Sequence, residues 1–190
     1  MITRIAPRLA FAALAALSAL GALGAAGAVA APLASGDAAF LKQAAQAGLA
    51  EVEGSKLAVD KAVNTQVKGF AQQMVDDHMK AHDALRKLAS SKGVELPAEP
   101  SVAQKAKLRL LASSDGAAFD RRYADSIGVG AHEDTVRLFQ KAATGASDAD
   151  VKAWAATTLP TLQHHLEMAR EMKSVAAKEG NAKAPHDRKQ

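Results

Sequence analysis

The spacing of apolar residues after residue 37 restricts the fold more than any other feature of this chain. Apolar side chains recur every three or four residues rather than alternating, in long segments rich in alanine, leucine, lysine and glutamate. Aromatic residues make up only 4% of the sequence, and β-branched residues are sparse. A period near 3.6 residues places apolar side chains on one face of a helix. The sequence therefore predicts an all-α protein.

Capping signals and glycines divide this region into helices. The predicted long helices cover residues 37–62, 65–91, 117–143 and 148–177, and a short one lies near 101–112. Candidate N-terminal caps are Ser35 or Asp37, Asn64 or Thr65, Asp115, and Ser147, which forms a capping-box pattern with Asp150. Gly93 and Gly145 are expected to end the second and third long helices.

The lengths of the links select one topology. The links between the first two and the last two long helices are short, whereas residues 92–116 form a long link interrupted by Pro97 and Pro100. An up-down-up-down bundle needs no connection of that length. We therefore expect a ferritin-like antiparallel four-helix bundle, in which a long crossover with a short extra helix joins helices 2 and 3.

The N-terminus is typical of an export signal. Arg4 and Arg8 precede an apolar run over residues 9–30, and no acidic residue occurs before Asp37. We expect a signal peptide over residues 1–30 with cleavage before Ala31, which predicts a periplasmic protein with no transmembrane segment after cleavage. An uncleaved membrane anchor is the alternative. The other predicted regions are a linker at 31–36, the bundle at 37–178 and a disordered tail at 179–190.

Charge and cysteine content exclude several kinds of site. Removing Arg4 and Arg8 with the signal lowers the formal charge from +4 to +2, which argues against nucleic-acid binding. The chain has no cysteine, so disulfides, thiolate metal sites and cysteine nucleophiles are excluded. No phosphate-binding glycine loop or Ser/His/Asp triad pattern is present.

A polar residue interrupts the apolar stripe near the middle of each long helix. These residues are Glu51, His78, His132 and His165. Each lies midway along a helix of about 26 to 29 residues, so an antiparallel bundle brings them to a similar height. On the third long helix the expected inward stripe is Asp125, Val129, His132, Val136 and Phe139. The four central residues are therefore predicted to share one buried layer.

Such a layer suits a transition metal ion. A histidine or carboxylate in an apolar core costs several kcal/mol unless a side chain or a metal ion pairs with it. Neutral imidazoles with carboxylates bind zinc, copper, iron or manganese, and Asp77 can ligate or orient an imidazole. A hydrogen-bonded network that only fixes helix register is the main alternative. Val75 and Leu162 replace the glutamates of the di-iron Glu-x-x-His pattern, so ferroxidase chemistry is not expected.

Other polar residues have simpler interpretations. His82 lies one turn after His78 and is expected to be a partly exposed surface residue, while His164 points about 100° away from its neighbour His165. Tyr123 lies one turn after Asp120, where its hydroxyl can hydrogen-bond a buried carboxylate.

The chain resembles a large family of exported bacterial ferritin-like domains of unknown function. The resemblance covers about 130 residues. Its matching stretches are Ala50-Glu51-Val52-Glu53, the run from Phe70 to His78, Phe119-Asp120-Arg121-Arg122-Tyr123, His132-Glu133, and the run from Leu159 to Leu166. It implies a ferritin-like fold and export, but no established activity. The recurrent polar positions that it implies are Glu51, Asp77, His78, Asp120, Tyr123, His132 and His165.

These features favour a binding protein over an enzyme. The expected ligand is a transition metal ion or a small polar molecule at the central layer, in a role such as envelope stress handling. Glu51, His78, His132 and His165 are the expected ligands, supported by Asp77, Asp120 and Tyr123. The alternatives are a structural or interaction module that contacts an envelope protein, and a redox enzyme that uses the same layer.

Overall fold

Helices make up most of the part of the chain that the structure describes. The computed structural model describes residues 32–182, with side chains through 177, and this range contains no strand. Its elements are α1 (Ser35–Lys61), α2 (Thr65–Ser91), α3 (Val102–Ala112), α4 (Gly116–Tyr123), the π-helical segment η1 (Ala124–Ala131), α5 (His132–Gly145) and α6 (Ala149–Ala182). The prediction of an all-α fold is confirmed. The predicted signal peptide and residues 183–190 of the predicted tail lie outside the described residues.

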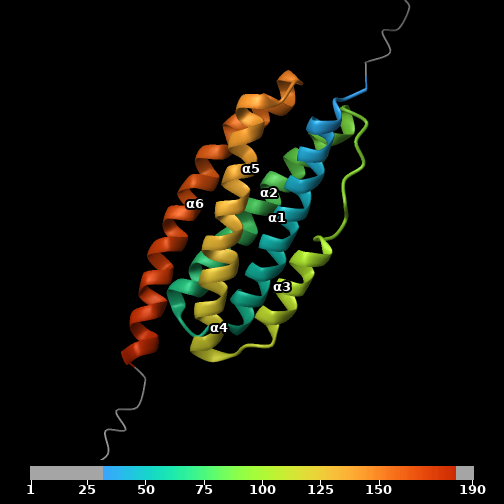
Figure 1. Ribbon diagram of the computed structural model, residues 1–190. Helices are drawn as coiled ribbons and strands as arrows, with labels where there is room; N and C mark the ends of the chain where they lie inside the picture. Colours follow the sequence, from blue (N-terminus) through green and yellow to red (C-terminus); the bar gives the residue numbers. More distant parts are fainter. Residues whose placement is uncertain (1–31, 183–190) are drawn as a thin grey trace, which may run out of the picture. The chain divides into compact units, whose positions relative to one another are not determined.

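Each long helix has two long neighbours. α1 packs mainly on α2, and α5 packs mainly on α6, while α6 also contacts α2 and η1. α1 and α5 contact each other more sparsely, and α3 packs against α1. Figure 1 shows the long helices lying side by side, with the link from α2 to α3 running along them. None of the described helices is both long enough and apolar enough to cross a membrane.

Side-chain caps set several of the helix starts. The Asn64 side chain accepts hydrogen bonds from the amides of Gln66 (2.8 Å) and Val67 (3.1 Å), as predicted. Ser101 and Gln104 form a capping box at the start of α3. The prediction for α6 was wrong by one residue. Its cap is Asp148 rather than Ser147, because the Asp148 carboxylate accepts from the amides of residues 150 and 151.

The end of α2 agrees with the prediction, whereas the C-terminal end of α6 does not. Gly93 takes a positive φ of 66° directly after α2, which explains why a glycine ends that helix. α6 continues to Ala182, whereas the sequence placed its end near residue 177. The first four residues of the predicted disordered tail are therefore helical.

The third predicted helix changes its winding halfway along. Residues 124–131 form a π-helix between α4 and α5, whereas the apolar spacing predicted uninterrupted α-helix. A π turn holds more residues than an α turn, so it rotates the faces before and after it relative to each other. As a result Ile127 is only 3% exposed, while Asp125, predicted to face inward, is exposed and pairs with Lys173 at 2.9 Å.

Two buried aspartates hold the short loops at the ends of the helices. Asp120 accepts hydrogen bonds from the amides of Val63 (3.2 Å) and Asn64 (2.8 Å), in the loop between α1 and α2. Asp37 does the same for Ser147 (3.0 Å) and Asp148 (2.8 Å), in the loop between α5 and α6. Asp120 was predicted to support the central layer, but it binds this loop instead.

Replacing Asp120 by alanine is expected to lower the free energy of unfolding by about 2 kcal/mol, because two backbone amides lose a charged acceptor. Urea denaturation measures the change. Asp115→Ala is the matched control: Asp115 pairs with Lys61 at 2.9 Å, but its side chain is largely exposed, so the loss should stay below about 0.5 kcal/mol. Equal losses in the two variants would contradict this role for Asp120.

Candidate metal centre

Three histidines and one glutamate meet in a polar layer inside the helices. Glu51 comes from α1, His78 from α2, His132 from the start of α5 and His165 from α6, and none of them is more than 4% exposed. Along the chain each polar residue lies between two apolar clusters, one that includes Phe70 and one that includes Phe139. For His132, the first residue of α5, the residue on the Phe70 side is Ile127 in η1. The expected convergence of the four residues is therefore what the structure shows.

The three imidazoles lie close enough to share one ion. Their ring centres are 5.3 Å apart for His78 and His165, 5.4 Å for His78 and His132, and 5.7 Å for His132 and His165. One ring nitrogen from each histidine lies within 4.8 Å of the corresponding nitrogens of the other two. A single metal ion can bridge donor atoms at these separations with small side-chain adjustments.

The π-helical segment orients His132. The Nδ1 atom of His132 lies 3.1 Å from the carbonyl oxygen of Ile127, which is in η1. Because a carbonyl only accepts, Nδ1 of His132 carries the proton and donates it. In a neutral His132 the Nε2 atom is then unprotonated and carries a lone pair. This atom lies 3.4 Å from Nε2 of His78.

His78 lies between this lone pair and a carboxylate. Its Nδ1 atom is 3.1 Å from Oε2 of Glu51, and its Nε2 atom is the one that faces His132. A neutral imidazole has one proton for these two acceptors. If the proton is on Nδ1, two Nε2 lone pairs face each other, and if it is on Nε2, a lone pair faces the carboxylate. In either tautomer, one ring nitrogen of His78 faces another acceptor across a short contact.

His165 presents a second unused lone pair. Its Nε2 atom lies 3.2 Å from Oδ2 of Asp77, so this nitrogen donates to the carboxylate. The other nitrogen, Nδ1, is buried and has no hydrogen-bond partner. Asp77 thus orients an imidazole, which is one of the two roles expected from the sequence.

Burial keeps the His78 and His165 rings uncharged near neutral pH. Burial is the largest cause that lowers the pKa of His78, opposed by Glu51 and reinforced by His132. Burial, with the nearby His78 and His132, lowers the pKa of His165 to about 4, although Asp77 opposes the shift. Neutral imidazoles have the lone pairs that a metal ion requires.

Glu51 differs from its expected role as a ligand. Its Oε1 atom accepts a hydrogen bond from the Thr135 hydroxyl at 2.9 Å, and it lies 3.9 Å from Nδ1 of His132. Its Oε2 atom approaches His78 through Nδ1, but the contact is not aligned as a hydrogen bond. The possible metal-binding group within residues 32–177 consists of the three histidines without Glu51. The glutamate orients His78 from behind.

The remaining sequence candidates lie outside the layer. Tyr123 is fully buried, but its hydroxyl is 2.9 Å from Oγ of Ser55 rather than bonded to Asp120. His82 is half-buried and His164 is exposed, as expected. Thr135 was not predicted from the sequence, although it lies one turn after His132 and shares its inward face.

Comparison with known proteins gives a family and a fold. Residues 22–172 match the model of a family described as "Domain of unknown function (DUF4142)". A comparison with curated proteins finds no match. Among solved structures, a DUF305 fragment from Deinococcus radiodurans has a similar fold, with a TM-score of 0.66 and 12% sequence identity. The similarity covers 78% of this chain and 99% of that fragment.

Proposed function

Because the chain belongs to the DUF4142 family, whose description assigns no activity, we propose from the site itself that the protein binds one transition metal ion through His78, His132 and His165. The observation that carries the proposal is the group of buried imidazole nitrogens that lie together in the layer. The Nε2 atoms of His78 and His132 are 3.4 Å apart, and Nδ1 of His165 has no partner. A cation held by these nitrogens satisfies all three rings at once.

The groups behind the rings support this role. Each histidine has an acceptor at the nitrogen that faces away from the shared centre, namely Glu51 for His78, the Ile127 carbonyl for His132 and Asp77 for His165. Metal-ligating histidines usually donate their second N–H to such a carboxylate or carbonyl, which fixes the tautomer and raises the basicity of the ligand. A network that serves only to fix helix register has no need of three converging lone pairs.

The ligand set favours zinc or copper over manganese or magnesium. Three imidazole nitrogens with no carboxylate in direct reach suit zinc and copper, whereas harder ions prefer oxygen ligands. Three histidines also leave a coordination position open. A cavity of about 30 Å³, lined by His78, Glu51 and Thr135 among others, lies beside the layer and has room for a water molecule.

The wider setting is also part of the proposal. We propose that the helices form a ferritin-like four-helix bundle, because α1, α2, α6 and α5 contact one another in turn and the long link joins α2 to α3. We further propose an exported, periplasmic protein, on the basis of Arg4, Arg8 and the apolar run that follows them. A metal-binding bundle in that compartment fits a role in envelope metal handling or stress.

The test is metal binding by protein purified without a histidine tag. We expect about one equivalent of zinc or copper per chain, measured by calorimetric titration and elemental analysis. The variants His78→Ala, His132→Ala and His165→Ala should each weaken binding at least about a hundredfold, because each removes one of three ligands. His82→Ala and His164→Ala are matched controls that should bind like the wild type.

The same variants distinguish the structural alternative. If the layer only holds the helices together, the wild type binds less than a stoichiometric amount of metal and the His→Ala variants lose stability without any change in binding. Either result, substoichiometric metal or equal affinity in all five variants, contradicts the proposed function.

A further inference from the structure

Asp77 on α2 connects the polar layer to the protein surface. Its side chain is 29% exposed, whereas the side chains of Glu51 and the three histidines are between 0% and 5% exposed. A metal ion that binds in the layer has to pass from solvent into this buried space. Asp77 is therefore the first of these groups that an ion in solvent can contact.

The two oxygens of the Asp77 carboxylate have different surroundings. Oδ2 lies 3.2 Å from Nε2 of the buried His165, and Oδ1 lies 3.4 Å from Nζ of Lys80, whose side chain is 77% exposed. An ion pair as exposed as the one with Lys80 contributes little to stability, so a divalent cation can displace the lysine. A single carboxylate thus reaches both the solvent and a proposed metal ligand.

The His165 ring is free to turn at a small cost. Its Nε2–H group donates to Asp77, and its Nδ1 atom is buried without a partner. A half-turn about the Cβ–Cγ bond breaks that one hydrogen bond and brings Nδ1 to the place of Cδ2, which is the ring atom beside Nε2. Nδ1 then lies on the side of Asp77 instead of the shared centre. Because the proton of the neutral ring is on Nε2, Nδ1 has a lone pair in both positions, and no proton has to leave when an ion binds it.

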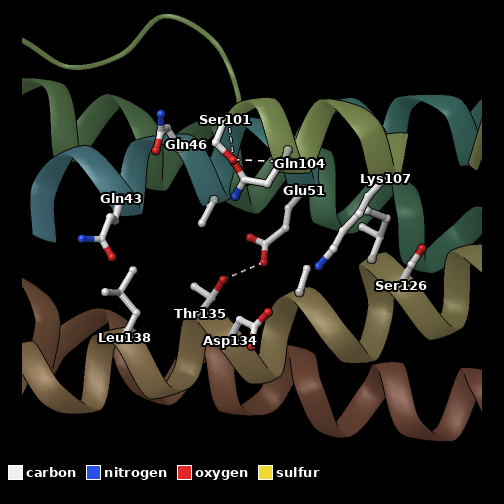
Figure 2. Close-up of a pocket in the computed structure, with 14 residues that line it drawn as sticks. Gln43, Gln46, Glu51, Ser101, Gln104, Lys107, Ser126, Asp134, Thr135 and Leu138 are labelled. Atoms are coloured by element: carbon white, nitrogen blue, oxygen red, sulfur yellow. Dashed lines mark hydrogen bonds between the residues drawn. The ribbon is translucent and has the colours of Figure 1, made fainter. Parts of the chain in front are cut away.

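The other openings beside the layer suit an entering cation less well. A pocket of about 300 Å³ between α1, α3 and α5 borders Glu51, but Figure 2 shows the Lys107 amino group pointing into it, where it repels cations. Asp134, which also lines this pocket, pairs with Arg137. The cavity beside His78 has a volume of about 30 Å³, which is the space of one water molecule, so a hydrated ion does not fit.

We propose that Asp77 is the port through which a divalent cation enters the layer. The cation displaces Lys80 from the Asp77 carboxylate, binds Nδ1 of the turned His165 ring and moves to the shared centre as that ring turns back. Asp77 is then a transient ligand during entry and a positioning residue for His165 afterwards. This inference rests on the proposed function, because it assigns the route by which the same ion arrives.

The test is the rate of zinc association, measured by stopped-flow mixing with a fluorescent zinc indicator. Asp77→Asn keeps an oxygen that accepts from His165 but removes the charge that attracts the ion. We expect the association rate constant to fall about tenfold and the dissociation rate constant to change less than about threefold. If Asp77 only orients His165, association stays unchanged and dissociation becomes faster. Asp76→Asn is the matched control, because Asp76 is the exposed neighbour on α2 and contacts Gln72 instead of the layer.

Three further variants separate the charge from the route. Asp77→Glu keeps the charge and should load zinc within about threefold of the wild-type rate. Lys80→Met removes the competing cation and should make association about threefold faster, whereas Lys68→Met, at an exposed position on the same helix, should not. Gly48→Val narrows the 30 Å³ cavity, since a Cβ at Gly48 meets nothing within 4 Å, and should leave the rate unchanged.

The outcomes distinguish this inference from the proposed function. Equal association rates in Asp77→Asn and Asp76→Asn, an effect of Asp77→Asn on dissociation alone, or slower association in Gly48→Val but not in Asp77→Asn overturns the assignment of the port. If the wild type binds one zinc ion in any of these cases, the proposed function stands and only this inference is refuted. A wild type that binds neither zinc nor copper refutes both.

Discussion

Replacing Gly54 by valine is expected to lower the free energy of unfolding by about 3 kcal/mol, because the added methyl groups overpack the core. A Cβ atom at Gly54 would lie 2.9 Å from Cγ1 and 3.0 Å from Cδ1 of Ile127. Ile127 is 3% exposed and belongs to the apolar cluster that includes Phe70, so moving its side chain breaks core contacts. Either α1 or η1 must shift to make room.

This shift should also reach the metal centre. The carbonyl of Ile127 is the acceptor that fixes the His132 ring, at 3.1 Å from Nδ1. Moving that carbonyl allows the ring to rotate, so we expect zinc or copper affinity to fall about tenfold in Gly54→Val, in line with the loss of other groups that orient metal ligands. Chemical denaturation and metal titration of the same sample measure both effects.

A double-mutant cycle isolates the contact. Adding Ile127→Ala removes the side-chain atoms that clash, so the stability losses of Gly54→Val and Ile127→Ala should fall short of additivity by at least about 1 kcal/mol. Gly69→Val is the control on α2, since a Cβ at Gly69 meets nothing within 4 Å. Additive losses, or an equal loss in Gly69→Val, would show that Gly54 does not position Ile127.

Local patterns in the sequence were sufficient to predict most of the helices. The ends of α1, α2 and α3 follow from apolar spacing, from the Asn64 cap and from Gly93. The central layer was also predictable, because a polar residue in the middle of an apolar stripe must be paired in the core. Only the positions of residues along each helix are needed to predict that layer.

Features that depend on contacts between distant segments were not predictable. The π-helix at 124–131 has no signal in the apolar spacing, although Gly128 and Gly130 allow close approach: a Cβ at Gly128 would lie 3.0 Å from Cε of Met172. Likewise, Asp120 binds a loop 56 residues away along the chain. The position of Glu51 behind His78 depends on how α1 is rotated about its axis relative to α2. A period of 3.6 residues does not fix that rotation precisely enough to predict which atoms are in contact.

Metal-free protein is expected to lose stability as the pH falls from 6.5 to 4. The pKa of His165 in the folded protein is lowered to about 4, below its ordinary value of 6.5. Between these two values the unfolded chain binds a proton that the folded chain does not, so protonation favours unfolding. Above pH 6.5 the ring is neutral in both states and has no effect. The lowered pKa of His78 acts in the same direction.

The expected loss from His165 alone is about 2 kcal/mol by pH 4, which is less than the full shift because its partner Asp77 is partly exposed to solvent. Urea denaturation at four pH values between 7.5 and 4.5 measures the slope. His165→Leu should reduce this slope, because the variant has no ring at position 165 to protonate. His164→Leu, at the exposed neighbouring position, should keep the wild-type slope. Equal slopes in the two variants would contradict the assignment of the loss to His165.

The lowered pKa of His165 also determines the lowest pH at which the metal remains bound. Metal and proton compete for the same lone pairs, so a histidine site normally releases zinc as the pH falls below about 6.5. Here the proton binds His165 only near pH 4, because burial and the neighbouring rings oppose the charged form. We therefore expect zinc or copper to remain bound at pH 5.5, where the His165 ring still presents an unprotonated nitrogen. Release with a midpoint near pH 6.5, measured by titration with a metal indicator, would mean that burial does not hold the His165 ring neutral.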